Sequence, residues 1–140
     1  MYIKRKITPV LLIAIFLGLT SGCNMPVEET VQNTRIVVQN YYWAKPGMEE
    51  DVYQQRLLAS NVRSKYGHPV GRVLRLTTKS DSLPDVIWEC DYPNVKAREK
   101  DVERITHNEE FSKVADKMGT LLNKFDRAIY EVTVPVARVE

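Results

Sequence analysis

Residues 35–43 read RIVVQNYYW and lead directly into Ala44-Lys45-Pro46-Gly47. β-Branched and aromatic side chains are typical of a strand, and a Pro-Gly pair ends one. We therefore expect this stretch to be the central strand of a small α+β sheet, around which the rest of the chain is arranged.

The segment after this strand predicts a helix over residues 48–66, because its apolar residues recur at helical spacing. Acidic residues at 49–51 and the basic Arg63 and Lys65 match the two ends of the helix dipole. Gly67 stands where a left-handed C-cap belongs.

Two alternating segments, 71–77 (GRVLRLT) and 85–92 (DVIWECDY), predict an antiparallel hairpin. A turn centred near Ser82 would place Arg75 opposite Glu89, and Leu76 opposite Trp88. This register pairs charge with charge and apolar with apolar side chains.

The remaining elements are two helices and a strand. Residues 94–104 are charged and predict a helix. Thr106 to Glu109 has the T-x-x-E form of a capping box, and the helix after it is expected to run to Phe125, weakened at Gly119 by about 1 kcal/mol relative to Ala. Residues 127–134 predict a last strand, followed by a short tail, 135–140.

The order β-α-β-β-α-β is that of the ferredoxin-like arrangement, an α+β fold with a four-stranded antiparallel sheet and helices on one face. The other face is then open. From the period of two we assign to the open face Val37, Gln39, Tyr41, Trp43, Val73, Arg75, Thr77, Ile87, Glu89, Asp91, Ile129, Glu131 and Thr133. The face under the helices receives Ile36, Val38, Leu74, Leu76, Val86, Trp88, Cys90, Ala128, Tyr130 and Val132.

The composition fits one globular domain, with 140 residues, of which 44% are hydrophobic and 27% charged. The formal charge is +2, but three of the 20 basic residues lie at positions 4–6. Without residues 1–22, 17 Lys and Arg remain against 18 Asp and Glu. Such a balance argues against a nucleic-acid partner.

Residues 1–22 have the features of a signal peptide: basic residues at 4–6, an apolar run over 10–19 and small residues just before Cys23. About ten apolar residues are too few to span a bilayer, which needs roughly twenty. We therefore expect a cleaved targeting segment.

Leu19-Thr20-Ser21-Gly22-Cys23 resembles the lipobox of bacterial lipoproteins, with the leucine four residues before the cysteine instead of three. The resemblance implies that Cys23 carries palmitate or similar acyl chains and anchors the protein to a membrane of the bacterial cell envelope, outside the cytoplasm. Residues 23–34 would then be the lipidated N-terminus and its tether. The alternative is a secreted protein in which Cys23 is a free or paired thiol. Cys90 is expected to be a small buried apolar residue.

Over residues 35–134 the chain resembles the dimeric α/β-barrel superfamily, which includes antibiotic-biosynthesis-monooxygenase-like and NIPSNAP-like proteins. Three features carry the resemblance: the first strand entering a K-P-G turn, VIWECDYPN before a charged helix, and the N-E-E-F helix start. It implies a homodimer whose sheets pack face to face, often with a ligand cavity between sheet and helices. Some members oxidise polyketide quinones without a cofactor. One branch degrades haem, but Ile105 and Ala115 occupy the positions of that branch's Trp and His.

Candidate ligand-binding residues lie on the predicted open face and are Gln39, Tyr41, Trp43, Arg75 and Glu89. The aromatic pair could line a pocket, with packing as the alternative, and the charged pair could polarise a ligand, with a cross-strand ion pair as the alternative. His68 and His107 lack a third metal ligand at a suitable spacing, so we expect no metal site. No cofactor-binding motif occurs in the sequence.

Two functions remain. One is a membrane-anchored binding or structural homodimer that takes, at most, a small apolar or aromatic ligand. The other is a cofactor-independent monooxygenase-like enzyme acting on a small aromatic substrate, which would need an acid-base pair or an oxyanion donor inside a cavity.

Overall fold

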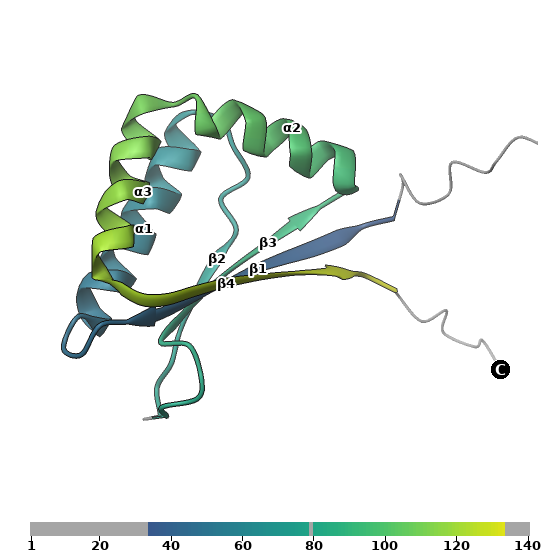
Figure 1. The fold of residues 1–140 in the computed structure, drawn as a ribbon. Helices are drawn as coiled ribbons and strands as arrows, with labels where there is room; N and C mark the ends of the chain where they lie inside the picture. Colours follow the sequence, from purple (N-terminus) through teal and green to yellow (C-terminus); the bar gives the residue numbers. More distant parts are fainter. Residues whose placement is uncertain (1–33, 79, 134–140) are drawn as a thin grey trace, which may run out of the picture.

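The computed structural model describes residues 34–78 and 80–133. The ferredoxin-like α+β arrangement is confirmed, with two helices in its second connection (Figure 1). The elements are β1 (Ile36–Ala44), α1 (Glu49–Lys65), β2 (Arg72–Arg75), β3 (Val86–Tyr92), α2 (Val95–Thr106), α3 (Glu109–Leu121) and β4 (Leu122–Glu131).

The four strands form one antiparallel sheet in the order β2-β3-β1-β4. All three helices lie over the same face of this sheet (Figure 1). β1 pairs with β3 on one side and β4 on the other, which confirms its predicted central position.

Burial along β1 alternates from Ile36 to Trp43, as expected for a strand covered on one face only. Its even-numbered residues lie beneath the helices, and its odd-numbered residues face the open side. The main core consists of Ile36, Val38, Tyr42, Val52, Val86, Trp88, Cys90, Tyr92, Met118 and Leu121. Cys90 is therefore a buried core residue, as predicted.

Asparagines cap the two helices of the second connection. The side chain of Asn94 accepts from Ala97 N at 2.8 Å, and that of Asn108 accepts from Phe111 N at 2.9 Å. The capping box predicted at Thr106 is wrong, because Thr106 is the last residue of α2 and its hydroxyl donates to carbonyls of that helix.

The chain passes from α3 to β4 without a loop. α3 ends at Leu121 and β4 begins at Leu122, so Phe125 belongs to the strand and not to the predicted long helix. Gly119 lies inside α3, and the break follows it by two residues.

The β2–β3 register differs from the prediction by three residues. Arg72 lies opposite Glu89, where the sequence predicts Arg75. Because successive side chains of a strand alternate between faces, an odd shift exchanges the two sides. Val73 therefore lies on the helix side and Leu74 on the open side.

Gly71 accounts for this register. Its φ is +68°, and a Cβ at this position would lie 2.7 Å from Trp88 Nε1 and closer still to the carbonyl oxygen of Glu89. Only glycine allows this approach, which brings the start of β2 against the middle of β3. Val73, not Leu76, consequently lies opposite Trp88.

The sides of β4 are also the reverse of those predicted, because Ile129 lies opposite Val38 and Ala128 opposite Gln39. β4 is an edge strand, and Ile129 is 48% exposed although it lies on the helix side. The apolar residues of β4 therefore did not indicate which of its two faces lies under the helices. Four residues predicted on the open face lie toward the helices: Val73, Arg75, Ile129 and Glu131. Three residues predicted under the helices lie on the open face: Leu74, Ala128 and Tyr130. Four further residues of the predicted faces lie outside the strands: Leu76, Thr77, Val132 and Thr133.

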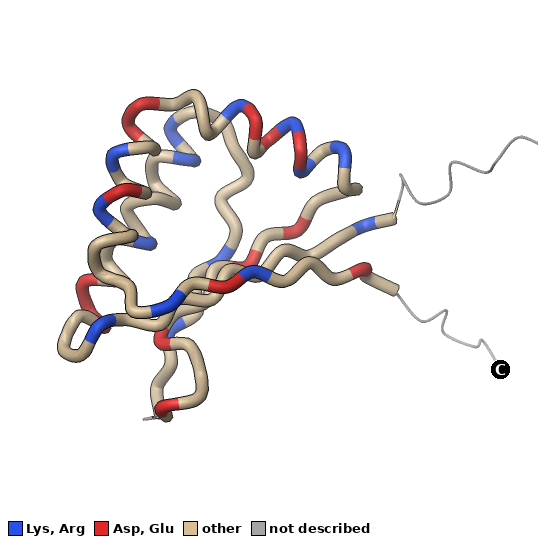
Figure 2. Tube along the Cα trace, in the orientation of Figure 1, with Lys and Arg blue, Asp and Glu red and all other residues tan. Residues whose placement is uncertain are grey.

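Charged positions of both signs are interspersed along α2 and α3 (Figure 2). Among the described residues, no helix is long and apolar enough to cross a membrane. The predicted signal segment, Cys23, the tether up to residue 33 and the predicted tail 135–140 lie outside the described residues.

Candidate ligand-binding cavity

A cavity of about 400 Å³ lies between the sheet and the helices. Its size falls within the usual range for small-molecule sites. The lining comes from β1, β3, β4 and all three helices: Val38, Asn40, Tyr42, Arg56, Ala59, Arg63, Trp88, Tyr92, Arg98, Val102, Ile105, Thr106, Phe111, Val114, Ala115, Met118, Gly119, Leu122, Phe125 and Arg127.

One stripe of α3 forms the apolar wall of the cavity. Phe111, Val114, Ala115, Met118 and Gly119 line it at spacings of three and four residues, which places them on one helical face. A Cβ at Gly119 would meet nothing within 4 Å. Gly119 itself is exposed, so this free space lies at the mouth of the cavity.

Polar side chains from the sheet reach the opposite wall. Asn40 is buried on the helix side of β1; its Oδ1 accepts from Arg127 Nε at 2.7 Å and its Nδ2 donates to the Tyr42 hydroxyl at 3.3 Å. Arg127 and its strand neighbour Phe125 are exposed on the edge strand. The cavity thus opens toward β4, with an amide, a phenol and a guanidinium beside that opening.

Arg56 on α1 lines the cavity and is only 4% exposed. Its guanidinium carbon lies 4.8 Å from the centre of the Trp88 ring, and Nη2 donates to Ser60 Oγ at 3.2 Å. Nε is buried without a hydrogen-bond partner. Burial lowers the pKa of Arg56, and the nearby Arg63 cation adds to this effect.

Arg63, two turns further along α1, has a complete set of partners. It forms a buried ion pair with Asp101 of α2 and donates to Pro69 O at 2.7 Å and to the Tyr92 hydroxyl at 3.2 Å. Asp101 also accepts from Tyr92 at 2.7 Å, and its other oxygen lies 2.7 Å from Nδ1 of the buried His68.

Burial opposes ionisation of Asp101, but hydrogen bonds from Tyr92, His68 and Arg63 outweigh it and hold the pKa of Asp101 below its usual value. Burial, together with the bond to Asp101, raises the pKa of Tyr92. This cluster joins α1, β3 and α2 and closes the side of the cavity next to Arg63. The polar groups of this cluster form hydrogen bonds with one another, so we assign the cluster a structural role and not a chemical one.

The charge of the cavity lining is one-sided. Four arginines line it, and the lining contains no Asp, Glu or His. Within residues 34–78 and 80–133, no three His, Cys, Asp or Glu side chains are grouped to hold a metal ion. His107 lies at the end of α2, where Nδ1 contacts Glu103 O at 2.7 Å.

Three of the five ligand-binding residues predicted from sequence lie together, but on the open face of the sheet and not in the cavity. Tyr41 donates to Gln39, and Gln39 donates to Glu89. Glu89 also accepts from Arg72, and the Tyr130 hydroxyl lies 3.0 Å from that of Tyr41. The result is a hydrogen-bonded ladder across all four strands. The bond with Tyr130, aided by burial, raises the pKa of Tyr41 to about 12.

The other two predicted residues form no hydrogen bond of the ladder. The ring centres of Trp43 and Tyr41 lie 6.2 Å apart, and Lys124 Nζ lies 4.2 Å from the centre of the Trp43 ring. Arg75 is on the helix side, where it pairs with Glu50 of α1 at 2.6 Å, so the predicted Arg75–Glu89 ion pair is wrong.

The cavity residues themselves were not singled out from the sequence. A signal was present in α1, where Arg56 and Arg63 lie seven residues apart on the stripe that also carries Val52, Ala59 and Val62. Charged residues on the apolar stripe of an amphipathic helix are uncommon and indicate a buried polar site.

Solved structures resemble this fold. The chain has a TM-score of 0.57 to a NIPSNAP family protein from Agrobacterium tumefaciens, at 13% identity, covering 72% of this chain and 88% of that one. It has a TM-score of 0.54 to a dimeric protein of unknown function and ferredoxin-like fold from Bacteroides fragilis, at 10% identity over 70% of this chain and 96% of that one.

A third similar structure, from Bacteroides thetaiotaomicron, is provisionally assigned as an antibiotic biosynthesis monooxygenase; it has a TM-score of 0.50 and 11% identity over 76% of this chain and 95% of that one. At these identities the likeness shows the fold alone. No protein-family model and no curated protein matches the sequence.

Proposed function

We propose that this protein is a lipid-anchored homodimer of the bacterial cell envelope that binds a small, largely apolar organic molecule in the cavity between its sheet and helices. The observation that carries the proposal is the cavity of about 400 Å³, which combines an apolar α3 wall with convergent polar groups from β1 and α1. That combination is the usual composition of a small-molecule site.

Binding is favoured over catalysis by the chemistry of the lining. Asn40 and Tyr42 reach the cavity and could donate to a developing oxyanion, which supports the cofactor-independent monooxygenase as a second candidate. The fold similarity to the assigned monooxygenase is consistent with it. However, the described lining has no carboxylate or imidazole to abstract a proton from a substrate. Binding alone therefore accounts for the site with fewer assumptions.

The homodimer is proposed through the open face of the sheet. Leu74 and Tyr130 are 42% and 49% exposed there, beside the half-buried Val37, Tyr41 and Ile87. This face carries apolar side chains on either side of the hydrogen-bonded ladder, and its exposure to water on a monomer is unfavourable. A two-fold copy would cover it, and two similar ferredoxin-like structures are described as dimeric.

The lipid anchor at Cys23 is proposed from the sequence, because a cysteine directly follows the apolar run and the small residues of a signal segment. Several acyl chains would hold the protein at a membrane more firmly than one. The tether over residues 23–34 would then place the cavity close to the membrane surface.

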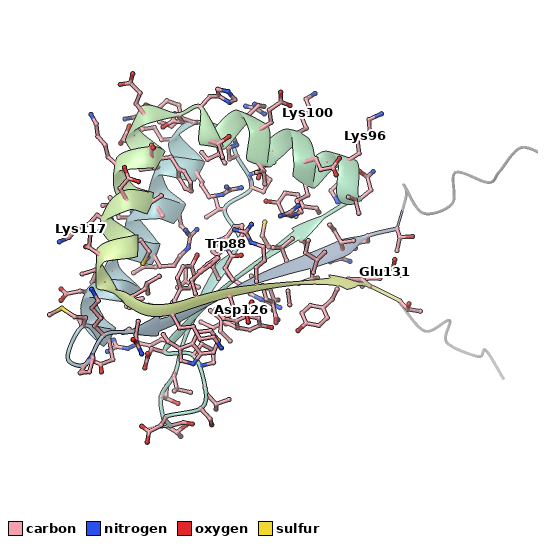
Figure 3. All side chains as sticks on the ribbon, viewed as in Figure 1. Trp88, Lys96, Lys100, Lys117, Asp126 and Glu131 are labelled. Atoms are coloured by element: carbon pink, nitrogen blue, oxygen red, sulfur yellow. The ribbon has the colours of Figure 1, made fainter. Side chains whose placement is uncertain are left out.

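The test of the binding site uses Gly119→Phe, which places a ring at the mouth of the cavity on its α3 wall. Gly119→Ala is the matched control, since it adds helix propensity without filling the space. Lys117→Phe is the control for an added ring, because Lys117 extends from α3 away from the sheet (Figure 3).

Naphthalene-2-carboxamide, an uncharged two-ring probe, is titrated calorimetrically into each protein. We expect Gly119→Phe to weaken binding by about tenfold or more, equivalent to about 1.4 kcal/mol, and both controls to bind like the parent chain. Equal binding by parent and Gly119→Phe would place the probe elsewhere and contradict the proposal. Absence of binding to the parent chain at millimolar concentration, both of this probe and of the matching acid 2-naphthoate, would contradict it as well.

A further inference from the structure

We infer that the molecule bound in this cavity is an organic acid, whose apolar, aromatic body lies against α3 and whose carboxylate is bound by Arg56. The inference rests on the proposed binding function and adds the chemical class of the ligand. It is drawn from the surroundings of a single buried cation.

Arg56 is a buried charge without a countercharge. At 4% exposure it has lost most of its hydration, yet no Asp or Glu among the described residues forms an ion pair with it. Its polar neighbours Ser60 and Tyr42 are both neutral hydroxyls, and Nε has no hydrogen-bond partner. Burying an unpaired charge is strongly unfavourable, so an arrangement of this kind calls for an anion.

Arg63 provides the comparison within the same helix. Its side chain is equally buried, but it is matched by the carboxylate of Asp101, a carbonyl oxygen and a phenol. The fold thus supplies a full set of partners for the arginine that holds α1 to α2. Arg56 has the same Trp88 ring beside it and lacks the carboxylate.

The rest of the lining favours the same class of ligand. Arg98 and Arg127 add positive charge, and no lining residue is acidic. The electrostatic potential inside is therefore positive, and an uncharged or cationic molecule would leave it uncompensated. A planar guanidinium with several N–H donors matches the geometry of a carboxylate.

The body of the ligand is set by the apolar wall. Trp88 lies between the helices and the sheet (Figure 3), and Phe111, Phe125 and the thioether of Met118 complete a largely aromatic surface around the space. Aromatic rings pack well against such side chains. An aromatic acid would pack its ring against this apolar wall and pair its carboxylate with the Arg56 cation.

The experiment compares 2-naphthoate with naphthalene-2-carboxamide, which has nearly the same shape and no charge at neutral pH. Each is titrated calorimetrically into the full chain, as its host processes it, held in phosphatidylcholine nanodiscs with empty nanodiscs as the blank. The proteins are the parent chain, Arg56→Met, Arg56→Lys and Arg104→Met. Arg104 is an exposed residue of α2 outside the cavity lining and serves as the matched control.

We expect the parent chain and Arg104→Met to bind the acid about tenfold or more tightly than the amide. Arg56→Met should abolish this preference by weakening the acid alone, and Arg56→Lys should retain part of it. Equal affinities of the parent chain for acid and amide would overturn the inference and leave the proposed function intact. A preference that survives in Arg56→Met would also overturn it, while failure of both probes to bind would overturn the proposed function itself.

Discussion

Arg56 and Arg63 lie two turns apart on α1, and both guanidinium groups approach the Trp88 ring, at 4.8 and 5.1 Å from its centre. They differ in one respect, because Asp101 neutralises Arg63 and no described carboxylate neutralises Arg56. A structural arginine and a ligand-binding arginine should therefore respond differently to the same substitution.

Arg63→Met should lower the free energy of unfolding by about 3–5 kcal/mol, since it leaves the buried Asp101 without its cation. Arg56→Met should leave stability unchanged or raise it, because it replaces an unpaired buried cation with an apolar chain of similar length. Urea unfolding of the two variants in the absence of ligand checks both. A loss in Arg56→Met as large as that in Arg63→Met would mean that Arg56 serves the fold.

Asp101 should make stability depend on acid pH. Its pKa is lower in the folded chain than in the unfolded chain, so its contribution is complete above the unfolded value of about 3.9 and is lost as pH falls through the folded value. We expect Asp101→Asn to be less stable at pH 7 and to lose less stability between pH 5 and pH 3 than the parent chain. The exposed carboxylates are common to both proteins, so their contributions cancel. Parallel stability–pH curves would be the contrary result.

Dimerisation through the open face predicts opposite results for two exposed leucines. Leu74 is 42% exposed on that face, and Leu58 is 46% exposed on α1. Leu74→Arg should convert the chain from residue 24 onward from dimer to monomer at micromolar concentration, because it would place an unpaired cation in the apolar part of the proposed interface. Leu58→Arg should remain dimeric. Light scattering decides, and a monomeric parent chain would contradict the interface.

Lipidation predicts that Cys23→Ser moves the protein out of the membrane fraction or stops its processing. The reason is that the serine hydroxyl does not replace the thiol in acyl transfer, so the anchor is lost. Cell fractionation with mass analysis of the N-terminus measures the effect. Complete removal of residues 1–22 together with unchanged membrane retention of Cys23→Ser would exclude a lipid at this position.

The sequence was sufficient for the elements whose pattern is local. RIVVQNYYW is rich in β-branched and aromatic side chains and leads into a Pro-Gly turn, and α1 has matched charges at both ends, so β1 and α1 are where they were predicted. The positions of β2 and β4 were not predictable in this way. Register depends on contacts between distant segments, such as the approach of Gly71 to Trp88. A slip by three residues exchanges the two faces of a strand, but the amino-acid sequence of that strand gives no sign of it.

The candidate site was harder to predict because its residues are brought together only by the fold. Asn40, Arg56 and Arg127 come from three elements, and none belongs to a motif of fixed spacing. The residues that were predicted, Gln39, Tyr41 and Glu89, do assemble, but on the opposite side of the sheet. Strand alternation distinguishes the two faces without indicating which one holds a cavity.

The most direct test of the binding site uses the two tryptophans, one on each side of the sheet. Trp88 lines the cavity, with its indole N–H donated to Val70 O at 2.7 Å, and Trp43 lies on the open face. Each gives one indole signal in a ¹⁵N–¹H NMR spectrum, and Trp43→Phe assigns them. Adding 2-naphthoate to the chain from residue 24 onward should shift the Trp88 signal and leave that of Trp43 in place. A shift of Trp43 alone, or of neither signal at saturating probe, would contradict a ligand site between sheet and helices.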